Sequence, residues 1–224
     1  MTKIGVFRLT RNGDYRLTLT TENGVAVTLS DGDTVKIVDN GKVFYDVPAS
    51  HWGAEAVDFA ASRELFSGTS AVTFEPDAAM NRGMLVTVLY RLENEPNVWG
   101  GGSYTDVPEG MYYSSAVAWA DGNGIVTGYA DAAFAPGRDI TREEMAVVLY
   151  RYARYKGLDV TASVDLGRYT DAASINGYAQ QALAWANANG LITADTTGAL
   201  TPKGYATRAQ VATILQRFLY LMDG

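Results

Sequence analysis

The sequence contains no cysteine and a single histidine among its 224 residues. The absence of cysteine excludes disulfides, thiolate metal sites and a cysteine nucleophile. His51 is the only base available to a histidine-dependent triad, and no Gly-x-Ser-x-Gly motif accompanies it. Asp31-Gly-Asp33 and Asp121-Gly-Asn123 lack the glutamate that closes an EF-hand loop and are typical of turns. We therefore expect no metal, no cofactor and no catalytic residue.

Long apolar runs and an excess of positive charge are also absent. No stretch approaches the roughly 18–20 apolar residues of a membrane span, and the N-terminus lacks the apolar run of a signal peptide. The net charge is −7, whereas a nucleic-acid partner requires a basic face. We expect neither membrane insertion nor nucleic-acid binding. The chain is either cytosolic or part of a longer exported protein, and its start directly in strand-like sequence favours the second interpretation.

The first 43 residues have the texture of a small β structure. Apolar and polar residues alternate in segments such as VFRL and TVKIV, and Asn-Gly or Asp-Gly dipeptides separate them at intervals of about ten residues. Such dipeptides supply the positive φ angles of tight hairpin turns. We predict an antiparallel β-meander over residues 1–43, which forms the end of a larger upstream domain or packs on the helical part of the chain.

From Phe44 onward the chain repeats itself three times, and we place the units at 44–98, 99–160 and 161–224. An arginine recurs in each unit, and 60 residues separate Arg82 from Arg142 while 66 separate Arg142 from Arg208. Other positions recur in the same order: Asp46, Asp106 and Asp171; Trp52, Tyr112 and Tyr178; Pro76, Pro136 and Pro202. Three copies of this length predict closure around a pseudo-threefold axis rather than a solenoid.

Each unit has the pattern of a helix, a loop and a second helix. We expect the first helix to begin near Ser50, Ser114 or Tyr178. In units two and three it ends at Asn123-Gly124 and Asn189-Gly190, where glycine suits a left-handed cap. Unit one has Arg63-Glu64 at this place, so we expect its helix to end differently. The predicted fold class is therefore mainly α.

The loop and the second helix of each unit supply the expected core. One large apolar residue lies two positions before each proline and is predicted to be a core plug: Phe74, Phe134 and Leu200. The second helix starts at Asn81, Thr141 or Thr207, and its apolar residues recur at helical spacing, as in Met145, Val148, Leu149 and Tyr152. We expect this face to be buried.

The arginine at the start of each second helix is not explained by capping. Thr141 and Glu144 form a capping box, and Thr207 with Gln210 forms its amide version. The arginine adds a positive charge at the positive end of the helix dipole. It either pairs with the aspartate of its own unit (Arg142 with Asp106, for example) or, beside unpaired N–H groups, forms an anion site. Both roles remain open, and both are compatible.

These motifs resemble those of the S-layer homology (SLH) family. The resemblance covers residues 44–220 and rests on "FYDVPASHW", "YTDVP", "GYADAAFAPGRDITREE" and the Thr-Arg-x-Glu signature. It implies three repeats around a central helical bundle, with grooves between them. It also implies non-catalytic anchoring of an exported protein to the Gram-positive cell wall, through a secondary cell-wall polysaccharide with a pyruvylated, anionic sugar.

The resemblance also implies roles for individual residues. The three arginines would contact the anionic sugar, the three aspartates would orient the groove, and Gly68 and Gly128 would let the backbone approach the ligand. Trp52, Tyr112 and Tyr178 would offer a stacking face for sugars. The alternative for these aromatic residues, which we favour, is that they cover the start of the first helix as part of the core.

The repeats depart from the family pattern to different extents. Unit one has Asn-Arg-Gly-Met for the signature, and unit three has Gln210 for the glutamate and Ala194 for the loop glycine. We therefore expect the groove of unit two to be the most competent. Two other functions stay open: a structural or protein-interaction module with degenerate grooves, and a glycan-processing enzyme, because paired carboxylates are not excluded by spacing alone.

Overall fold

The computed structural model describes residues 41–98, 104–129 and 131–223, and this part of the chain is mainly helical. Each repeat contributes two α-helices, and three short 3-10 helices precede the fifth. The bounds are α1 (Ala54–Ser62), α2 (Arg82–Leu92), α3 (Ser114–Gly122), α4 (Arg142–Tyr155), η1 (Leu166–Arg168), η2 (Ala172–Ser174), η3 (Gly177–Ala179), α5 (Gln180–Ala188) and α6 (Arg208–Asp223). The predicted mainly α fold of three helix–loop–helix repeats is confirmed. The predicted β-meander lies almost wholly outside the described residues.

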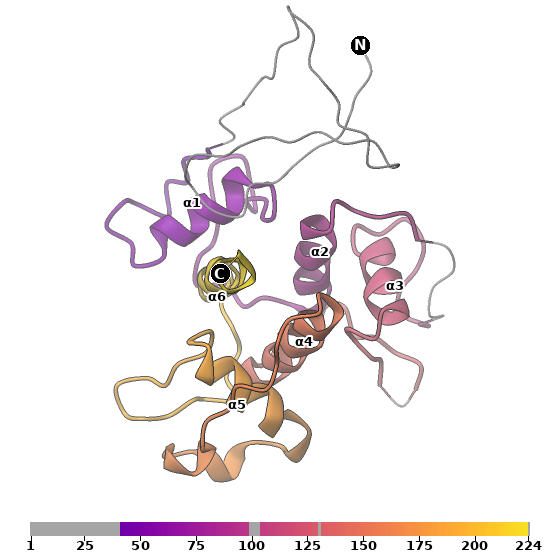
Figure 1. Ribbon diagram of the computed structural model, residues 1–224. Helices are drawn as coiled ribbons and strands as arrows, with labels where there is room; N and C mark the ends of the chain where they lie inside the picture. Colours follow the sequence, from indigo (N-terminus) through magenta and orange to yellow (C-terminus); the bar gives the residue numbers. More distant parts are fainter. Residues whose placement is uncertain (1–40, 99–103, 130, 224) are drawn as a thin grey trace, which may run out of the picture.

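The helices pair between repeats rather than within them. α2 packs against α3, α4 against α5, and α6 against α1. Each second helix therefore contacts the first helix of the next repeat, and the last repeat returns to the first. Figure 1 shows the result: α2, α4 and α6 lie at the centre, and α1, α3 and α5 lie outside them. The expected pseudo-threefold arrangement around a central bundle is thus confirmed.

A closed ring of backbone hydrogen bonds joins the segments that lead into the three second helices. The Met80 amide donates to the Ala206 carbonyl (2.9 Å), the Ala206 amide to the Ile140 carbonyl (3.1 Å), and the Ile140 amide to the Met80 carbonyl (2.8 Å). All three residues are buried, so each of these polar groups needs a partner within the protein. The ring fixes the N-terminal ends of α2, α4 and α6 against one another.

The second helices begin where the sequence predicts. Asn81 caps α2 by accepting a hydrogen bond from the Met84 amide (2.8 Å). Thr141 and Glu144 form the expected capping box at α4. At α6 the amide groups of Thr207 and Gln210 are bonded reciprocally to the side chains of Gln210 and Thr207. The caps account for the helix starts without any role for the arginines.

The first helices all end in the same way, which corrects one prediction. Gly124 and Gly190 come after α3 and α5 with a φ of 67°, as expected for left-handed caps. Glu64 takes the same place after α1 with a φ of 58°, and its amide bonds to the Ala61 carbonyl. Unit one thus keeps the cap geometry with a residue for which the left-handed region is unfavourable. The buried packing of Leu65 and Phe66, the next two residues, imposes this conformation despite the missing glycine.

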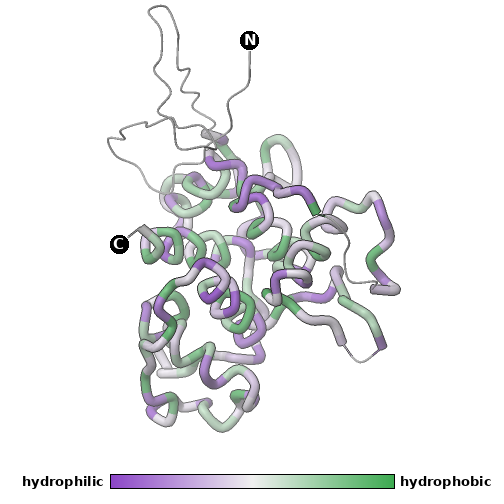
Figure 2. Tube along the Cα trace, turned by 45° about the vertical axis from the view of Figure 1, so that its right-hand side comes forward, coloured by the Kyte–Doolittle hydropathy of each residue, from purple (hydrophilic) through white to green (hydrophobic). Residues whose placement is uncertain are grey.

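The core contains the residues that helical spacing and repeat alignment single out. The plugs Phe74, Phe134 and Leu200 are wholly buried, and so are Met145, Leu149 and Tyr152, while Val148 is nearly so. In Figure 2 hydrophobic and hydrophilic segments alternate along the tube of the helices. None of the helices in the described ranges combines the length and the apolar character needed to cross a membrane.

Phe218 on α6 packs against aromatic residues of α4 and α5. Its ring centre lies 5.5 Å from that of Tyr152 on α4 and 6.3 Å from that of Trp185 on α5, and the side chain is wholly buried. We predict that Phe218→Ala lowers the free energy of unfolding by about 3–5 kcal/mol, because it leaves a cavity at the centre. Denaturant titration followed by circular dichroism measures the change. Leu221→Ala, on an exposed part of the same helix, serves as the control, and an equal effect of both changes would contradict the prediction.

Candidate functional site

Each recurring arginine reaches from the first position of a second helix into the loop of the following repeat. Arg82 donates from Nε to the Phe134 carbonyl (3.0 Å) and from Nη2 to the Thr127 carbonyl (3.1 Å). The other two arginines repeat this geometry: Arg142 with the carbonyls of Leu200 (2.8 Å) and Thr193 (2.9 Å), and Arg208 with those of Phe74 (2.7 Å) and Ser67 (2.8 Å). We name the three places junction 1–2 (Arg82), junction 2–3 (Arg142) and junction 3–1 (Arg208).

The recurring aspartates hold the same loops from the other side. Asp106 accepts hydrogen bonds from the amides of Phe134 and Ala135, both at 2.7 Å. Asp46 binds the amides of Phe74 and Glu75 in this way, and Asp171 those of Leu200 and Thr201. Each plug residue therefore has its amide fixed by an aspartate and its carbonyl by an arginine of the preceding repeat.

The predicted pairing of each arginine with the aspartate of its own unit is wrong. No ion pair joins any of the three arginines to these aspartates in the described ranges. The reason is the packing between repeats, which carries each arginine to the next unit: Arg142 shares a plug residue with Asp171, not with Asp106. Desolvation alone would raise the pKa of Asp46, but the hydrogen bonds from the Phe74 and Glu75 amides outweigh it and hold that pKa below its usual value.

The helix N-termini themselves are not free to bind an anion, which corrects the second part of the hypothesis. The amides of Arg142 and Glu143 donate to the carbonyls of Gly204 (2.9 Å) and Pro202 (3.1 Å), and the next amide is capped by Thr141. The first amides of α2 and α6 are bonded to loop carbonyls in the same manner. The helix amides therefore have no free N–H group for an anion, and the guanidinium groups are the recurring cations at these junctions.

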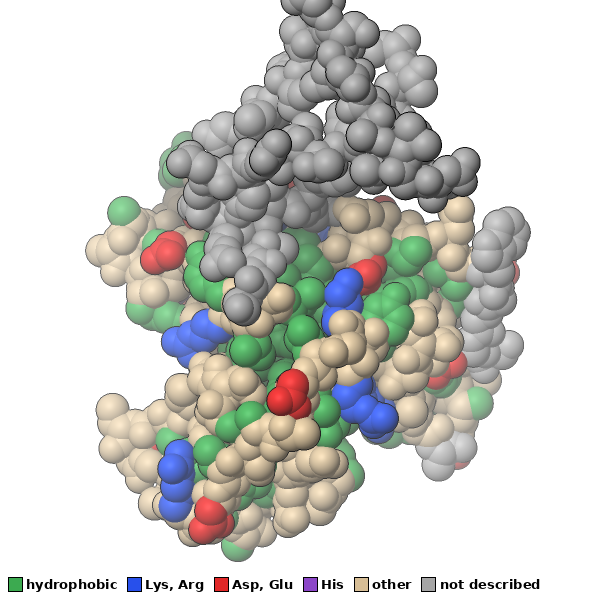
Figure 3. Space-filling view, viewed as in Figure 1, with side chains coloured by type: hydrophobic (Ala, Val, Ile, Leu, Met, Phe, Trp, Pro, Cys, Tyr) green, Lys and Arg blue, Asp and Glu red, His purple; other side chains and the backbone are tan. Residues whose placement is uncertain are grey.

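The guanidinium groups keep one edge for this purpose. Burial lowers the pKa of Arg82, Arg142 and Arg208, yet an arginine remains charged at neutral pH. Nη1 of each arginine makes no hydrogen bond to a described residue. Since Trp185 Nε1 is the one buried side-chain nitrogen or oxygen without a partner in the described ranges, the Nη1 atoms are not fully buried, although Arg82 and Arg208 are only 7% and 6% exposed. Figure 3 shows Lys and Arg side chains around the apolar centre of one face, at the notches between the lobes.

Gly68 and Gly128 are required by the packing of the loop itself. A Cβ at Gly128 would lie 2.2 Å from Tyr104 Cε1, and one at Gly68 would lie 2.4 Å from the Ser70 carbonyl oxygen and 2.7 Å from Phe44 Cε1. The aromatic residue two positions before each aspartate thus covers the glycine. Unit three has Ala194 here, although its loop keeps the backbone hydrogen bond of the other units, from the Asp195 amide to the Ala199 carbonyl (2.9 Å). Whether backbone at these glycines meets a ligand stays a prediction.

The three aromatic residues near the start of the first helices are exposed. Trp52, Tyr112 and Tyr178 expose 62%, 56% and 59% of their surface, so the favoured interpretation of these residues as core is wrong. The Tyr112 phenol lies close enough to Arg208 for the charge of Arg208 to act on its pKa, which burial raises overall. The aromatic faces are thus available to solvent beside the junctions, as a sugar-stacking role requires.

Glu143 is the centre of a buried polar cluster at junction 2–3. Its carboxylate is 2% exposed and accepts hydrogen bonds from the amide and side chain of Asn176, from the Tyr178 hydroxyl (3.1 Å) and from Lys203 Nζ (2.6 Å). The other two repeats have Gly83 and Ala209 at the same position. Gly83 and Ala209 have no polar side chain, so the aligned positions at junctions 1–2 and 3–1 cannot form this cluster.

A cluster at junction 1–2 was missed by the sequence interpretation. Arg138 is bonded to the Tyr129 hydroxyl and to Glu144, and both Arg82 and Arg138 lie over the Tyr129 ring. The aligned repeats do show that Arg138 is unusual, because the other units have Ala78 and Gly204 at this position. A residue present in one copy is not found by looking for recurrence.

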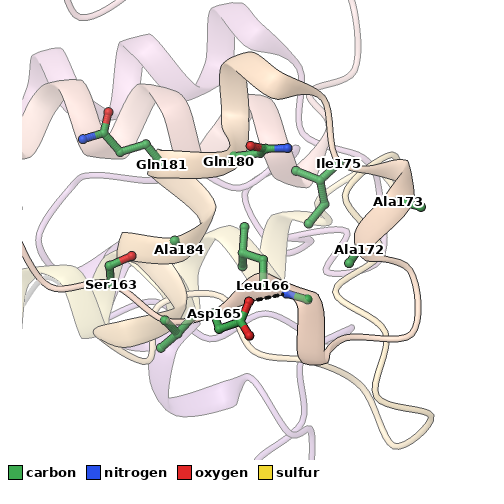
Figure 4. Close-up of a pocket in the computed structure, with 11 residues that line it drawn as sticks. Ser163, Asp165, Leu166, Ala172, Ala173, Ile175, Gln180, Gln181 and Ala184 are labelled. Atoms are coloured by element: carbon green, nitrogen blue, oxygen red, sulfur yellow. Dashed lines mark hydrogen bonds between the residues drawn. The ribbon is translucent and has the colours of Figure 1, made fainter.

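A separate pocket of about 680 Å³ lies in repeat 3, between η1, η2 and the start of α5. Figure 4 shows Gln180 and Gln181 on one side and Asp165, whose carboxylate binds the Gly167 amide (2.8 Å), on the other. None of the recurring arginines, aspartates or aromatic residues lines it. No group of three or more His, Asp or Glu side chains suited to a metal ion occurs in the described ranges.

We predict that Arg142→Ala lowers the free energy of unfolding by about 2–3 kcal/mol, because two charge-assisted hydrogen bonds to loop carbonyls are lost. Arg142→Lys should restore only part of the loss, since lysine cannot bond both carbonyls with a planar fork. Denaturant titration measures both. Arg154→Ala, on the exposed end of the same helix, is the matched control. Equal stability of Arg142→Ala and Arg154→Ala would rule out the clamp.

Glu143→Gln should destabilise the chain by about 1–3 kcal/mol, because an amide cannot accept all the hydrogen bonds that converge on the buried carboxylate. Glu109→Gln removes the same charge at an exposed position and should change the stability by less than about 0.5 kcal/mol. Thermal unfolding of the two variants gives the comparison. A melting temperature of Glu143→Gln equal to that of Glu109→Gln would show that the cluster contributes no stability.

Comparison with known proteins agrees with this architecture. The family model of the S-layer homology domain matches residues 43–83, 103–146 and 168–212, which together make up more than half of the chain. The chain is 29% identical over 182 residues to an amylopullulanase of Thermoanaerobacterium thermosulfurigenes. It is 27% identical over 180 residues to the surface-layer 125 kDa protein of Lysinibacillus sphaericus, and 31% over 115 residues to a cellulosome-anchoring protein of Acetivibrio thermocellus.

These matches cover much of this chain but little of the relatives. The shares of the chain are 80%, 78% and 48%, whereas the shares of the three relatives are 10%, 14% and 25%. The likeness to the amylopullulanase is thus confined to a small part of that enzyme. The family model, matched once in each repeat, spans the aspartate, the plug and the arginine that build the junctions. The chain belongs to the S-layer homology domain family.

Proposed function

We propose that this chain is a non-catalytic module that anchors a longer exported protein to the cell wall of a Gram-positive bacterium. Its ligand is a secondary cell-wall polysaccharide with an anionic, pyruvylated sugar, bound in grooves at the junctions between repeats. The observation that carries the proposal is the threefold recurrence of a largely buried guanidinium whose Nη1 is not fully buried and has no hydrogen-bond partner among the described residues. A family that includes surface-layer and cellulosome-anchoring relatives supports the anchoring role.

The recurring arginine suits a carboxylate ligand for electrostatic reasons. Its Nε and Nη2 atoms are already fixed to loop carbonyls, so the Nη1 edge is held in place before a ligand arrives. A pre-organised donor loses little side-chain entropy on binding, and a charge in a partly buried place is screened less by salt than one at the surface. The proposed roles of Arg82, Arg142 and Arg208 are therefore both to clamp the loop and to meet the anion.

The remaining candidate residues fit the same proposal. Asp46, Asp106 and Asp171 hold the loops that carry the carbonyl partners of the arginines, so they orient the groove without touching the ligand. Trp52 and its counterparts are exposed beside the junctions and offer apolar faces to a sugar ring. The proposed partner is thus a glycan, and the net charge of −7 agrees with binding through a few fixed cations rather than through a basic surface.

One observation favours a second function. Two of the three guanidinium nitrogens of each arginine are satisfied within the fold, so the arginines would recur for structural reasons even if the grooves had lost their glycan. In that case the repeats would serve as a structural or protein-interaction module. Catalysis has less support, because the match to the amylopullulanase covers 10% of that enzyme.

The test is sedimentation with purified cell walls. We expect the chain to sediment with Gram-positive walls that carry pyruvylated polysaccharide, and binding to fall at least about tenfold when the pyruvyl groups are removed, because a charge-assisted contact is lost. Absence of sedimentation with any pyruvylated wall would contradict anchoring and leave the structural alternative. Release of soluble sugar from the walls by the isolated chain would instead support an enzyme.

A further inference from the structure

The three junctions differ in the charges that surround the recurring arginine. At junction 2–3 the charged groups that act on Arg142 are Asp171 and Asp195. Asp195 accepts hydrogen bonds from the Thr197 and Ala199 amides, which hold it in place as a carboxylate. At an inter-repeat groove built to receive an anion, a fixed second carboxylate opposes binding.

Junction 3–1 has the same imbalance. The charged groups that raise the pKa of Arg208, against the effect of burial, are Glu75 and Asp46. The loop beside it carries hydroxyl groups, of which Thr69 and Ser70 are bonded to Thr73. Arg208 therefore lies near two carboxylates, as Arg142 does. The second cation of junction 2–3, Lys203, is already paired with the buried Glu143 (2.6 Å).

Junction 1–2 is different because it contains a second guanidinium. The Cζ atoms of Arg82 and Arg138 lie 4.8 and 5.1 Å from the centre of the Tyr129 ring. Glu144 is the nearby carboxylate, and its two oxygens are divided: Oε2 accepts the Thr141 amide (3.0 Å), while Oε1 holds Arg138. Asp106, the counterpart of Asp171 and Asp46, also holds the loop here. Two carboxylates thus face two arginines at this junction, whereas two carboxylates face one recurring arginine at each of the others.

The two guanidinium groups have donors to spare. Arg138 uses only Nη2 in its hydrogen bonds to Tyr129 and Glu144, and 43% of its side chain is exposed. Its Nε and Nη1, together with Nη1 of Arg82, make no hydrogen bond to a described residue. Tyr129 is 44% exposed between the loop and α4. A carboxylate above Tyr129 would meet donors from both arginines without displacing Glu144.

We propose that junction 1–2 is the principal site for the anionic sugar, and that Arg138 with Tyr129 gives it this preference over the other two junctions. The proposal rests on the proposed function and adds the place of binding and a residue outside the recurring pattern. It also changes the expectation for unit two. The loop of unit two lies at junction 1–2, whereas Arg142 of unit two lies at junction 2–3. The groove that we expect to bind best therefore combines the loop of unit two with Arg82 of unit one.

The test is calorimetric titration of the whole chain with N-acetylmannosamine carrying a pyruvate ketal, and with the same sugar lacking it. We expect Arg138→Ala to weaken binding of the ketal sugar at least about tenfold, because a charge-assisted contact with the ligand is lost. Lys156→Ala is the matched control: Lys156 is also a partly exposed cation bonded to a glutamate, Glu93, but at the other end of α4. It should change the affinity less than about twofold.

A double variant separates a direct contact from an effect of net charge. Arg138→Ala with Glu144→Gln keeps the net charge of the junction unchanged. Continued weak binding by the double variant would support contact between Arg138 and the ligand, and recovery to the wild-type affinity would overturn it. Circular dichroism of each variant confirms that the fold is retained, which the exposure of Arg138 leads us to expect.

The outcomes distinguish this proposal from the more general one. If the wild-type chain binds neither pyruvylated walls nor the ketal sugar, the proposed function fails. If the wild-type chain binds and Arg138→Ala binds equally well, the anchoring function stands and the assignment to junction 1–2 is overturned.

Discussion

The ring of three backbone hydrogen bonds at Met80, Ile140 and Ala206 is the constraint on which the rest of this fold depends. Each bond joins a different pair of repeats. The segment that leads into each second helix is therefore hydrogen-bonded to the other two repeats. Once the ring has formed, the first amides of α2, α4 and α6 point at carbonyls of the neighbouring loop, and the arginines extend into that loop beside them. The helices pack between repeats as well, because α2 contacts α3, α4 contacts α5 and α6 contacts α1.

The ring also explains an arginine in an electrostatically poor place. A cation at a helix N-terminus is unfavourable by about 0.3–1 kcal/mol, whereas a hydrogen bond to a charged group contributes about 1.5–3 kcal/mol. Each recurring arginine makes two such bonds, as Arg142 does to the carbonyls of Leu200 and Thr193, so the dipole effect is outweighed. The same bonds leave the guanidinium fixed with one edge outward, which makes a structural clamp compatible with ligand binding.

The features that the sequence predicts well are those set by local chemistry. The caps at Asn81, Thr141 and Thr207, the buried plugs and the apolar face of α4 depend on side-chain type and spacing alone. Partners across repeats were not predictable, because adjacent copies have nearly the same pattern and spacing does not say which copy meets which. This is why the sequence pairs Arg142 with Asp106 rather than with the loop held by Asp171. Residues present in one repeat, such as Arg138 and Glu143, carry no signal of recurrence, although they are what makes the three junctions different.

The contact between α6 and α1 has a mechanical consequence. Two junctions join repeats that are already consecutive in the chain, whereas junction 3–1 joins the last helix to the first with no covalent connection between them. A pulling force applied at the N-terminal side of repeat 1 therefore acts on a repeat that packs against both of the other repeats. Repeat 1 separates from the other repeats only when junctions 1–2 and 3–1 both break. The two junctions therefore share the force, and the repeats do not detach one after another.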